Sequence, residues 1–155
     1  MKETGARLQL MEDTGFLLSR SSGLAVRTTN AHLARFGLRV RQFSVLSVAC
    51  DRDGITQREL AEVLGLDPSQ IVALVDELEG AGLVERRPDP RDRRTRLVSA
   101  TRRGRFVRRK ASTATDDSRE QFLAPLGIEE RAVLHDLLRR LVVHAADDAG
   151  VMEAS

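Results

Sequence analysis

Residues 56–101, TQRELAEVLGLDPSQIVALVDELEGAGLVERRPDPRDRRTRLVSAT, contain the pattern that decides the fold. Thr56 and Glu59 stand three residues apart, the form of a capping box in which each side chain satisfies a free N–H of the first helical turn. An apolar face follows, and Gly65 ends it, because glycine adopts the left-handed conformation at little cost. The pattern predicts a short helix closed by a tight turn.

A second helix is predicted directly after this turn. Asp67 is a good N-cap, and Pro68 fits the first helical position, where its missing N–H costs nothing. The apolar positions then follow the i, i+3, i+4, i+7 spacing of an amphipathic helix; they are Ile71, Leu74, Val75 and Leu78. Gly80 and Gly82 end the stripe. Two helices joined by a glycine turn, the second held by apolar residues, match a helix-turn-helix.

The pattern then changes to that of a hairpin. Residues 83–87 and 95–100 read as two short strands, and the charged segment 88–94 between them holds two prolines. Prolines among charged residues indicate a loop, so the unit is expected to be a β-hairpin with a long tip.

Helices are predicted on both sides of this stretch. Their expected ranges are 8–36, with Gly15, Gly23 and Gly37 interrupting or ending it, 40–50, 101–122 and 128–146, and the tail 147–155 is expected to fray. The chain has 155 residues, 41% hydrophobic and 3% aromatic. That length suits one domain over residues 1–155, with a core built from aliphatic side chains.

Charge is unevenly distributed along the chain. The net charge is −3 over residues 1–85, +10 over residues 86–110 and −5 over residues 111–155. A basic block within an otherwise acidic chain is typical of a surface that binds phosphates. The block begins in the predicted hairpin, directly after the helix-turn-helix, and this combination indicates a nucleic-acid-binding protein.

Other classes of protein lack support in the sequence. The single Cys50 excludes an internal disulfide and makes a cysteine-based zinc site implausible. His32, His135 and His144 have no metal-ligand spacing, and no nucleophilic triad, paired carboxylates or phosphate loop appears, so we expect no metal, no cofactor and no enzyme. No apolar run reaches the length of a membrane span, and no signal segment precedes Gly15, so a cytoplasmic protein is expected.

The stretch quoted above resembles the DNA-binding lobe of the MarR family of bacterial transcriptional regulators. The most specific parts are LVDELE before a glycine, GLVERRPDPRDRR, and the LVSAT that leads into a helix. The resemblance implies a mainly helical α+β fold of about six helices and a β-hairpin wing. It places the winged helix-turn-helix lobe at residues 40–101 and long dimerisation helices at 1–36 and 102–146. It implies a homodimer that binds double-stranded DNA.

The resemblance also implies roles for individual residues. Residues 67–79 become the recognition helix for the major groove, where Gln70 pairs with adenine and Ser69 contacts base edges. Arg94 enters the minor groove, and Asp92 orients it through an ion pair. The DNA-binding set is Pro68, Ser69, Gln70, Ala73, Arg86, Arg91, Asp92, Arg93, Arg94 and Arg96.

The solvent face of the recognition helix departs from the family by being acidic. It carries Asp76, Glu77 and Glu79, which would repel phosphates if they faced DNA. We expect Asp76 to pair with a wing arginine such as Arg86, and the two glutamates to point away. The same acidic face supports one alternative, a winged-helix module that binds a partner protein instead of specific DNA.

Regulation is implied by the resemblance as well. Relatives respond to small phenolic or amphipathic anions that enter a cleft between the dimer helices and the DNA lobe, so a ligand-responsive repressor is expected. Candidate lining residues are Arg20, Arg27, His32 and Arg39. The other alternative is a redox-sensing regulator that uses Cys50, although its place on an apolar helical face favours a buried structural thiol.

Overall fold

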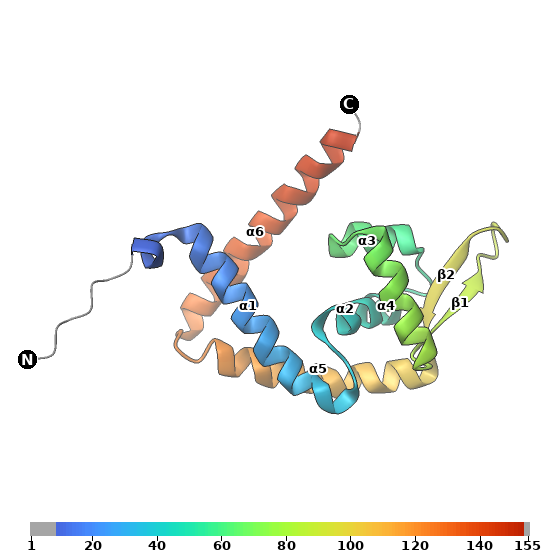
Figure 1. Cartoon of the computed structure of the whole chain (residues 1–155), viewed down its shortest axis with the longest axis horizontal. Coiled ribbons are helices and arrows are strands. Elements are labelled where there is room, and N and C mark those ends of the chain that lie inside the picture. Colours follow the sequence, from blue (N-terminus) through green and yellow to red (C-terminus); the bar gives the residue numbers. More distant parts are fainter. Residues whose placement is uncertain (1–8, 154–155) are drawn as a thin grey trace, which may run out of the picture. The chain divides into compact units, whose positions relative to one another are not determined.

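The computed structural model describes residues 9–153, and side chains up to residue 147. Its elements follow the chain in this order (Figure 1): η1 (Gln9–Glu12), α1 (Thr14–Leu33), η2 (Ala34–Phe36), α2 (Val40–Asp51), α3 (Gln57–Leu64), α4 (Pro68–Gly80), β1 (Val84–Pro88), β2 (Arg96–Ala100), α5 (Arg102–Phe122) and α6 (Ile128–Glu153). Packing divides the chain into two units, one ending at Arg119 and the other beginning at Glu120.

The expected fold class, mainly helical with one β-hairpin, is confirmed, and two boundaries differ. The first predicted helix is divided into η1, α1 and η2, and both Gly15 and Gly23 lie inside α1. Gly37 does end η2, with φ of 67°. The predicted fraying from residue 147 is wrong as far as Glu153, because α6 continues to that residue. Residues 1–8 and 154–155 lie outside the described part of the chain.

The helix-turn-helix forms as its sequence predicts. Thr56 Oγ1 accepts the Glu59 N–H at 3.2 Å, and Glu59 Oε2 accepts the Thr56 N–H at 2.8 Å. Gly65 ends α3 with φ of 60°. Pro68 occupies the first position of α4 and Asp67 the N-cap position, as expected, although the Asp67 carboxylate accepts no capping hydrogen bond.

A single apolar core lies between the helix-turn-helix and the hairpin. Its fully buried side chains come mainly from α2, α3, α4 and β2, and include Leu46, Leu60, Ile71 and Val98; α1 adds Leu33 and α5 adds Ala111. β1 and β2 pair antiparallel, with Val84 opposite Ala100. Ile55 adds a bridge to Val98, with N–H···O distances of 3.1 and 2.8 Å in the two directions. This bridge attaches the hairpin to the segment before α3, so the hairpin and helix-turn-helix form one lobe.

Gly104 brings α5 close to this lobe. A β-carbon at residue 104 would overlap the carbonyl oxygen of Leu83 and lie 3.2 Å from a methyl carbon of Leu46. Thr101 reinforces the junction by donating its hydroxyl to the Gly82 carbonyl at 2.7 Å. The helix therefore begins in direct backbone contact with the chain that enters the hairpin.

The second unit is formed by the end of α5 and by α6. Within it, Arg131 pairs with Glu120, with Nη1 and Oε2 2.5 Å apart, and also donates to the Leu126 carbonyl. Large apolar side chains of α6 are more than 40% exposed; they are Ile128, Val133, Leu137, Leu138, Leu141, Val142 and Val143. Exposed apolar side chains in this number are typical of an interaction surface.

Candidate DNA-binding interface

The first turn of α4 presents its polar side chains to solvent. Ile71, Val75 and Leu78 are buried and fix the rotation of the helix. The predicted contact residues Pro68, Ser69, Gln70 and Ala73 are all exposed, on positions that the buried stripe leaves free. The N–H groups of this first turn have no partner within the helix, which suits an anion or a base edge.

Arg86 links the recognition helix to the wing and to α3. Its guanidinium lies 2.5 Å from Asp76 Oδ1, is also paired with Glu79, and donates to Gln57 Oε1 at 3.0 Å. The Arg86 backbone N–H donates to Glu79 as well, at 3.0 Å. Burial by itself lowers the pKa of Arg86, but the two carboxylates outweigh it and raise that pKa. The expected Asp76–Arg86 pair is confirmed.

One expectation about this region requires correction. Glu79 does not point away, because it faces β1 and completes the pairing of Arg86. Arg86 is therefore engaged inside the lobe as a positioning residue, and its expected phosphate contact stays a prediction. The order of residues could have indicated this, since Glu79 stands near the end of α4 and Arg86 lies just beyond the turn that returns the chain.

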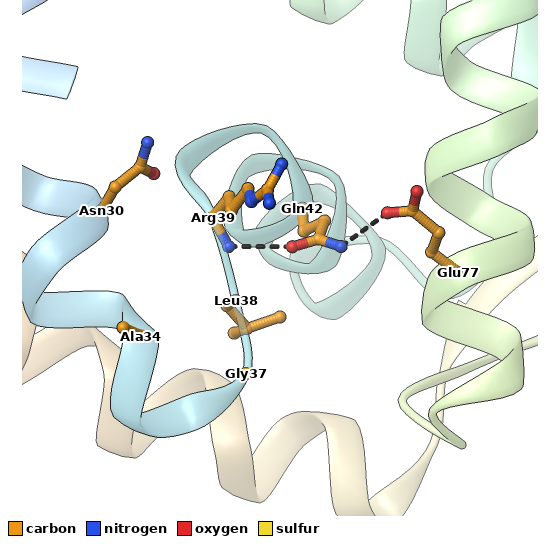
Figure 2. Close-up of a pocket in the computed structure, with 7 residues that line it drawn as sticks. All are labelled: Asn30, Ala34, Gly37, Leu38, Arg39, Gln42 and Glu77. Carbon is orange, nitrogen blue, oxygen red and sulfur yellow. Dashed lines mark hydrogen bonds between the residues drawn. The ribbon is translucent and has the colours of Figure 1, made fainter. Parts of the chain in front are cut away.

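Glu77 also has a partner within the lobe. Its Oε2 accepts a hydrogen bond from Gln42 Nε2 at 2.6 Å, and Gln42 Oε1 in turn accepts the Arg39 N–H at 2.8 Å (Figure 2). The α1 side chain of Asn30 accepts the Val40 N–H at 2.8 Å. These bonds join α1, the start of α2 and the recognition helix, and sequence reasoning missed them because they depend on tertiary packing.

The wing tip is held by two aspartates that accept backbone hydrogen bonds. Asp89 Oδ1 accepts the Arg91 N–H at 2.8 Å, and this bond lowers the pKa of Asp89. Asp92 accepts the Arg94 N–H and the Thr95 hydroxyl, both at 3.0 Å. Among the described residues no ion pair joins Asp92 to the Arg94 guanidinium, so the expected orienting ion pair is wrong. The role of Asp89 was missed, although aspartate before a turn is a typical signal.

The wing tip leaves its own cations exposed. They are Arg91, Arg93, Arg94 and Arg96. The Arg91 side chain is 89% exposed, and its Nε lies 3.5 Å from Asp89 Oδ1, a long contact. The twelve cations of residues 86–110 do not form one surface, however, because half of them lie on α5.

One pocket of about 470 Å³ lies beside the start of α2 (Figure 2). It is lined by Asn30, Ala34, Gly37, Leu38, Arg39, Gln42 and Glu77. Arg39 is thus the one expected ligand-binding residue in the lining. Arg20, Arg27 and His32 lie on α1 outside it.

Cys50 is half-buried at the end of α2 and packs against the core. Burial raises the pKa of its thiol, so the reactive thiolate is disfavoured at neutral pH. No group of three potential metal ligands occurs among the described residues. No described helix is long and apolar enough to cross a membrane.

A helix-turn-helix whose second helix presents a polar first turn, followed by a hairpin with an arginine-rich tip, defines a winged helix DNA-binding protein. The model of the MarR family matches residues 36–95. The chain is 31% identical over 101 residues to the transcriptional regulator HosA of Escherichia coli O111:H-, covering 65% of this chain and 75% of HosA.

Solved structures agree with this match. The structure of CouR from Rhodococcus jostii RHA1 bound to p-coumaroyl-CoA has a TM-score of 0.80 and 41% identity, over 90% of this chain and 96% of CouR. A mutant MarR from E. coli complexed with operator DNA has a TM-score of 0.78 and 28% identity, over 88% and 99% of the two chains. The chain belongs to the MarR family and is a DNA-binding transcriptional regulator, not an enzyme.

Proposed function

We propose that this regulator is a homodimeric, ligand-responsive repressor of a pseudo-palindromic operator. The observation that carries the proposal is the pairing, on one lobe, of an exposed α4 first turn with an exposed arginine tip. Gln70 and Ser69 would read base edges in the major groove, and Ala73 would meet a thymine methyl group. Arg94 would occupy the minor groove, and Arg91, Arg93 and Arg96 would contact phosphates.

Binding of operator DNA by Arg94→Ala tests the wing. The operator is first selected from random duplexes, and affinity is then measured at several salt concentrations. The substitution should weaken binding by about 1–3 kcal/mol. Its log-affinity slope against log salt should become shallower by about 0.9, one phosphate equivalent. The matched control is Arg41→Ala, which removes an exposed arginine of α2 that lies outside the interface. Equal affinities of Arg94→Ala and wild type would refute the assignment.

The dimer would use apolar side chains from both units of the chain. The exposed apolar side chains of α6, and Leu17, Leu18 and Val26 of α1, provide surface that a second copy would bury. Within the proposed dimerisation ranges, residues 9–36 and 102–146, the contact would be formed by these apolar side chains. Two recognition helices about 34 Å apart would then meet successive major grooves on one face of the duplex.

The pocket beside Arg39 is the proposed effector site. Arg39 supplies a cation at its lining, and CouR is bound to an anionic phenolic thioester. We therefore assign the effector to phenolic anions and their CoA thioesters. p-Coumaroyl-CoA and free p-coumarate should be added separately to the operator complex. The assignment is supported if a compound releases the wild-type protein from the operator but does not release Arg39→Ala. It is contradicted if neither compound releases either protein.

Gln42 gives this pocket a route to the recognition helix. An occupant that accepts the Gln42 amide N–H would compete with Glu77 and free that side of α4. Glu77→Ala should bind the effector with little change but show a smaller effector-induced loss of operator affinity. Isothermal titration and DNA binding measure the two quantities separately, and an unchanged response would remove Gln42 from the route.

Neither alternative gains support. The acidic face of α4, which favoured a protein-binding module, is largely occupied by internal pairing of Asp76, Glu77 and Glu79. A Cys50 redox switch requires a thiolate that burial disfavours.

A further inference from the structure

The first nine residues of α5 carry a second concentration of positive charge. Its cations are Arg102, Arg103, Arg105, Arg108, Arg109 and Lys110, and no acid follows until Asp116. Two of them have partners: Arg108 pairs with Asp51 at 3.3 Å, and Arg105 donates to the Cys50 carbonyl at 3.4 Å.

Arg102, Phe106, Arg109 and Lys110 share one exposed side of the helix, which we term the α5 basic face. The Lys110 ammonium lies 5.9 Å from the centroid of the Phe106 ring, and Phe106 is 54% exposed. Within the described part of the chain, Arg102, Arg109 and Lys110 form no ion pair with an acid. The face therefore has uncompensated charge.

The helical repeat fixes the direction of this face. An α-helix turns about 100° per residue, so Gly104 lies about 200° from Arg102, and Ala111 lies about 200° from Arg109. Gly104 packs against Leu83, and Ala111 is fully buried in the core. The α5 basic face consequently points away from the core of the winged helix lobe.

The operator surface does not include this face. α4 and α5 pack their buried sides, Ile71 and Val75 on α4 and Ala111 on α5, against one core. We therefore take the exposed sides of the two helices as separate surfaces. The wing tip lies beyond strands of five residues, about 16 Å from their α5 end. A duplex held by α4 and the wing tip leaves Arg102 and Arg109 uncovered.

We propose that the α5 basic face binds the phosphates of a second DNA duplex, without sequence preference, while the lobe holds the operator. The proposal adds a DNA-bridging activity to the proposed operator binding, on which it rests. Arg102 to Arg109 spans about 10 Å along the helix, comparable to about three steps of 3.4 Å along the duplex axis, each of which adds one phosphate per strand.

Duplex phosphates fit this face better than an acidic protein does. The cores of protein interfaces are apolar and poor in charged residues, especially lysine. Here the one exposed apolar side chain, Phe106, already has Lys110 over its ring. A second copy of the same face is excluded by like-charge repulsion across a two-fold axis.

A two-duplex capture experiment tests the proposal with the full-length protein. The selected operator is fixed to beads and saturated with protein, and a fluorescent duplex of unrelated sequence is added at several salt concentrations. The variant is Arg102→Gln/Arg109→Gln, and the matched control, Arg35→Gln/Arg41→Gln, removes two exposed arginines elsewhere. Arg102→Lys/Arg109→Lys keeps the charge, and thermal unfolding checks that every variant folds.

Wild type, the control and the lysine variant should all capture the second duplex, with a salt dependence that shows phosphate contacts. The glutamine variant should bind the operator within about twofold of wild type, yet capture at least about tenfold less of the second duplex. Absence of capture by wild type overturns the proposal and leaves operator binding intact. Equal capture by the glutamine variant overturns it too, as does parallel loss of operator binding and capture in a folded variant.

Discussion

At the scale of single residues, Arg86 shows how a cation in a basic segment can stabilise the fold through internal ion pairs. Its side chain is 23% exposed and is shared between two carboxylates and an amide. The neighbouring Arg87 is 51% exposed and makes only longer contacts, at 3.4 and 3.6 Å. The strand alternation that turns Arg86 inward turns Arg87 outward, so adjacent arginines have different roles.

Arg86→Ala should lower the free energy of unfolding by about 2 kcal/mol. It removes charge-assisted hydrogen bonds and leaves Asp76 and Glu79 close together without their cation. Urea unfolding measures the loss, and operator affinity should fall with it because α4 loses its link to the wing. Arg87→Ala is the matched control and should change stability by less than about 0.5 kcal/mol. Equal effects of the two substitutions would show that the Arg86 pairing contributes nothing.

At the scale of elements, the junctions between helices and strands decide how the lobe is assembled. The capping box starts α3, and the approach of Gly104 to Leu83 sets α5 against the hairpin. The first is a local device that a few adjacent residues encode. The second depends on two segments that meet only after folding.

Gly104→Ala should destabilise the protein by more than about 3 kcal/mol, or prevent folding. Alanine is usually better than glycine in a helix by about 1 kcal/mol, but here its β-carbon would overlap the Leu83 carbonyl. The control is Gly80→Ala at the end of α4, where nothing lies within 4 Å of the added carbon. Gly80→Ala should leave stability unchanged or raise it by up to about 1 kcal/mol. Thermal unfolding separates the two, and a stable Gly104→Ala protein would contradict this packing.

The capping box predicts a pH dependence. The Thr56 N–H, followed by its hydroxyl, lowers the pKa of Glu59 below its usual 4.5. A carboxylate whose pKa is lower in the folded protein than in the unfolded chain stabilises the fold at pH values above the unfolded pKa. This stabilisation is lost as pH falls through the folded pKa. Wild type should exceed Glu59→Gln in stability by a few tenths of a kcal/mol near neutral pH, since the pair is exposed. That difference should shrink as pH falls below the unfolded pKa and through the lowered folded pKa of Glu59. A constant difference in urea unfolding would show that ionisation of Glu59 is irrelevant.

At the scale of the whole molecule, the apolar side chains exposed on α6 support assembly into a dimer. Leu141 is 56% exposed in the single chain, and a soluble monomer rarely leaves such a row uncovered. A second copy would cover these side chains. In the proposed dimer, operator binding would be tighter, because once one lobe is bound the second lobe binds at a high effective concentration.

Leu141→Glu should shift the protein towards the monomer and weaken operator binding by at least about tenfold. A buried, unpaired carboxylate at the interface costs several kcal/mol, whereas the same change on a monomer surface is nearly neutral. Sedimentation equilibrium measures the association, and Glu130→Gln on the same helix provides a surface control. A Leu141→Glu protein that remains fully dimeric would place the interface elsewhere.

The sequence alone determined the class of fold and most of the elements. Capping box, glycine turns, apolar stripes and the proline-containing loop act over a few neighbouring residues, so Thr56, Gly65 and Pro68 could be read without a structure. The exposed first turn of α4 and the cationic wing tip followed from the same local patterns.

Only the tertiary structure decided where each charge points. Arg86 and Arg94 look alike in the sequence, but one is enclosed by Asp76 and Glu79 and the other is exposed at the wing tip. The basic block likewise divides between the wing and α5. The physical reason is that the pairing of a charged side chain depends on groups brought close by folding, and linear spacing does not encode which groups those are.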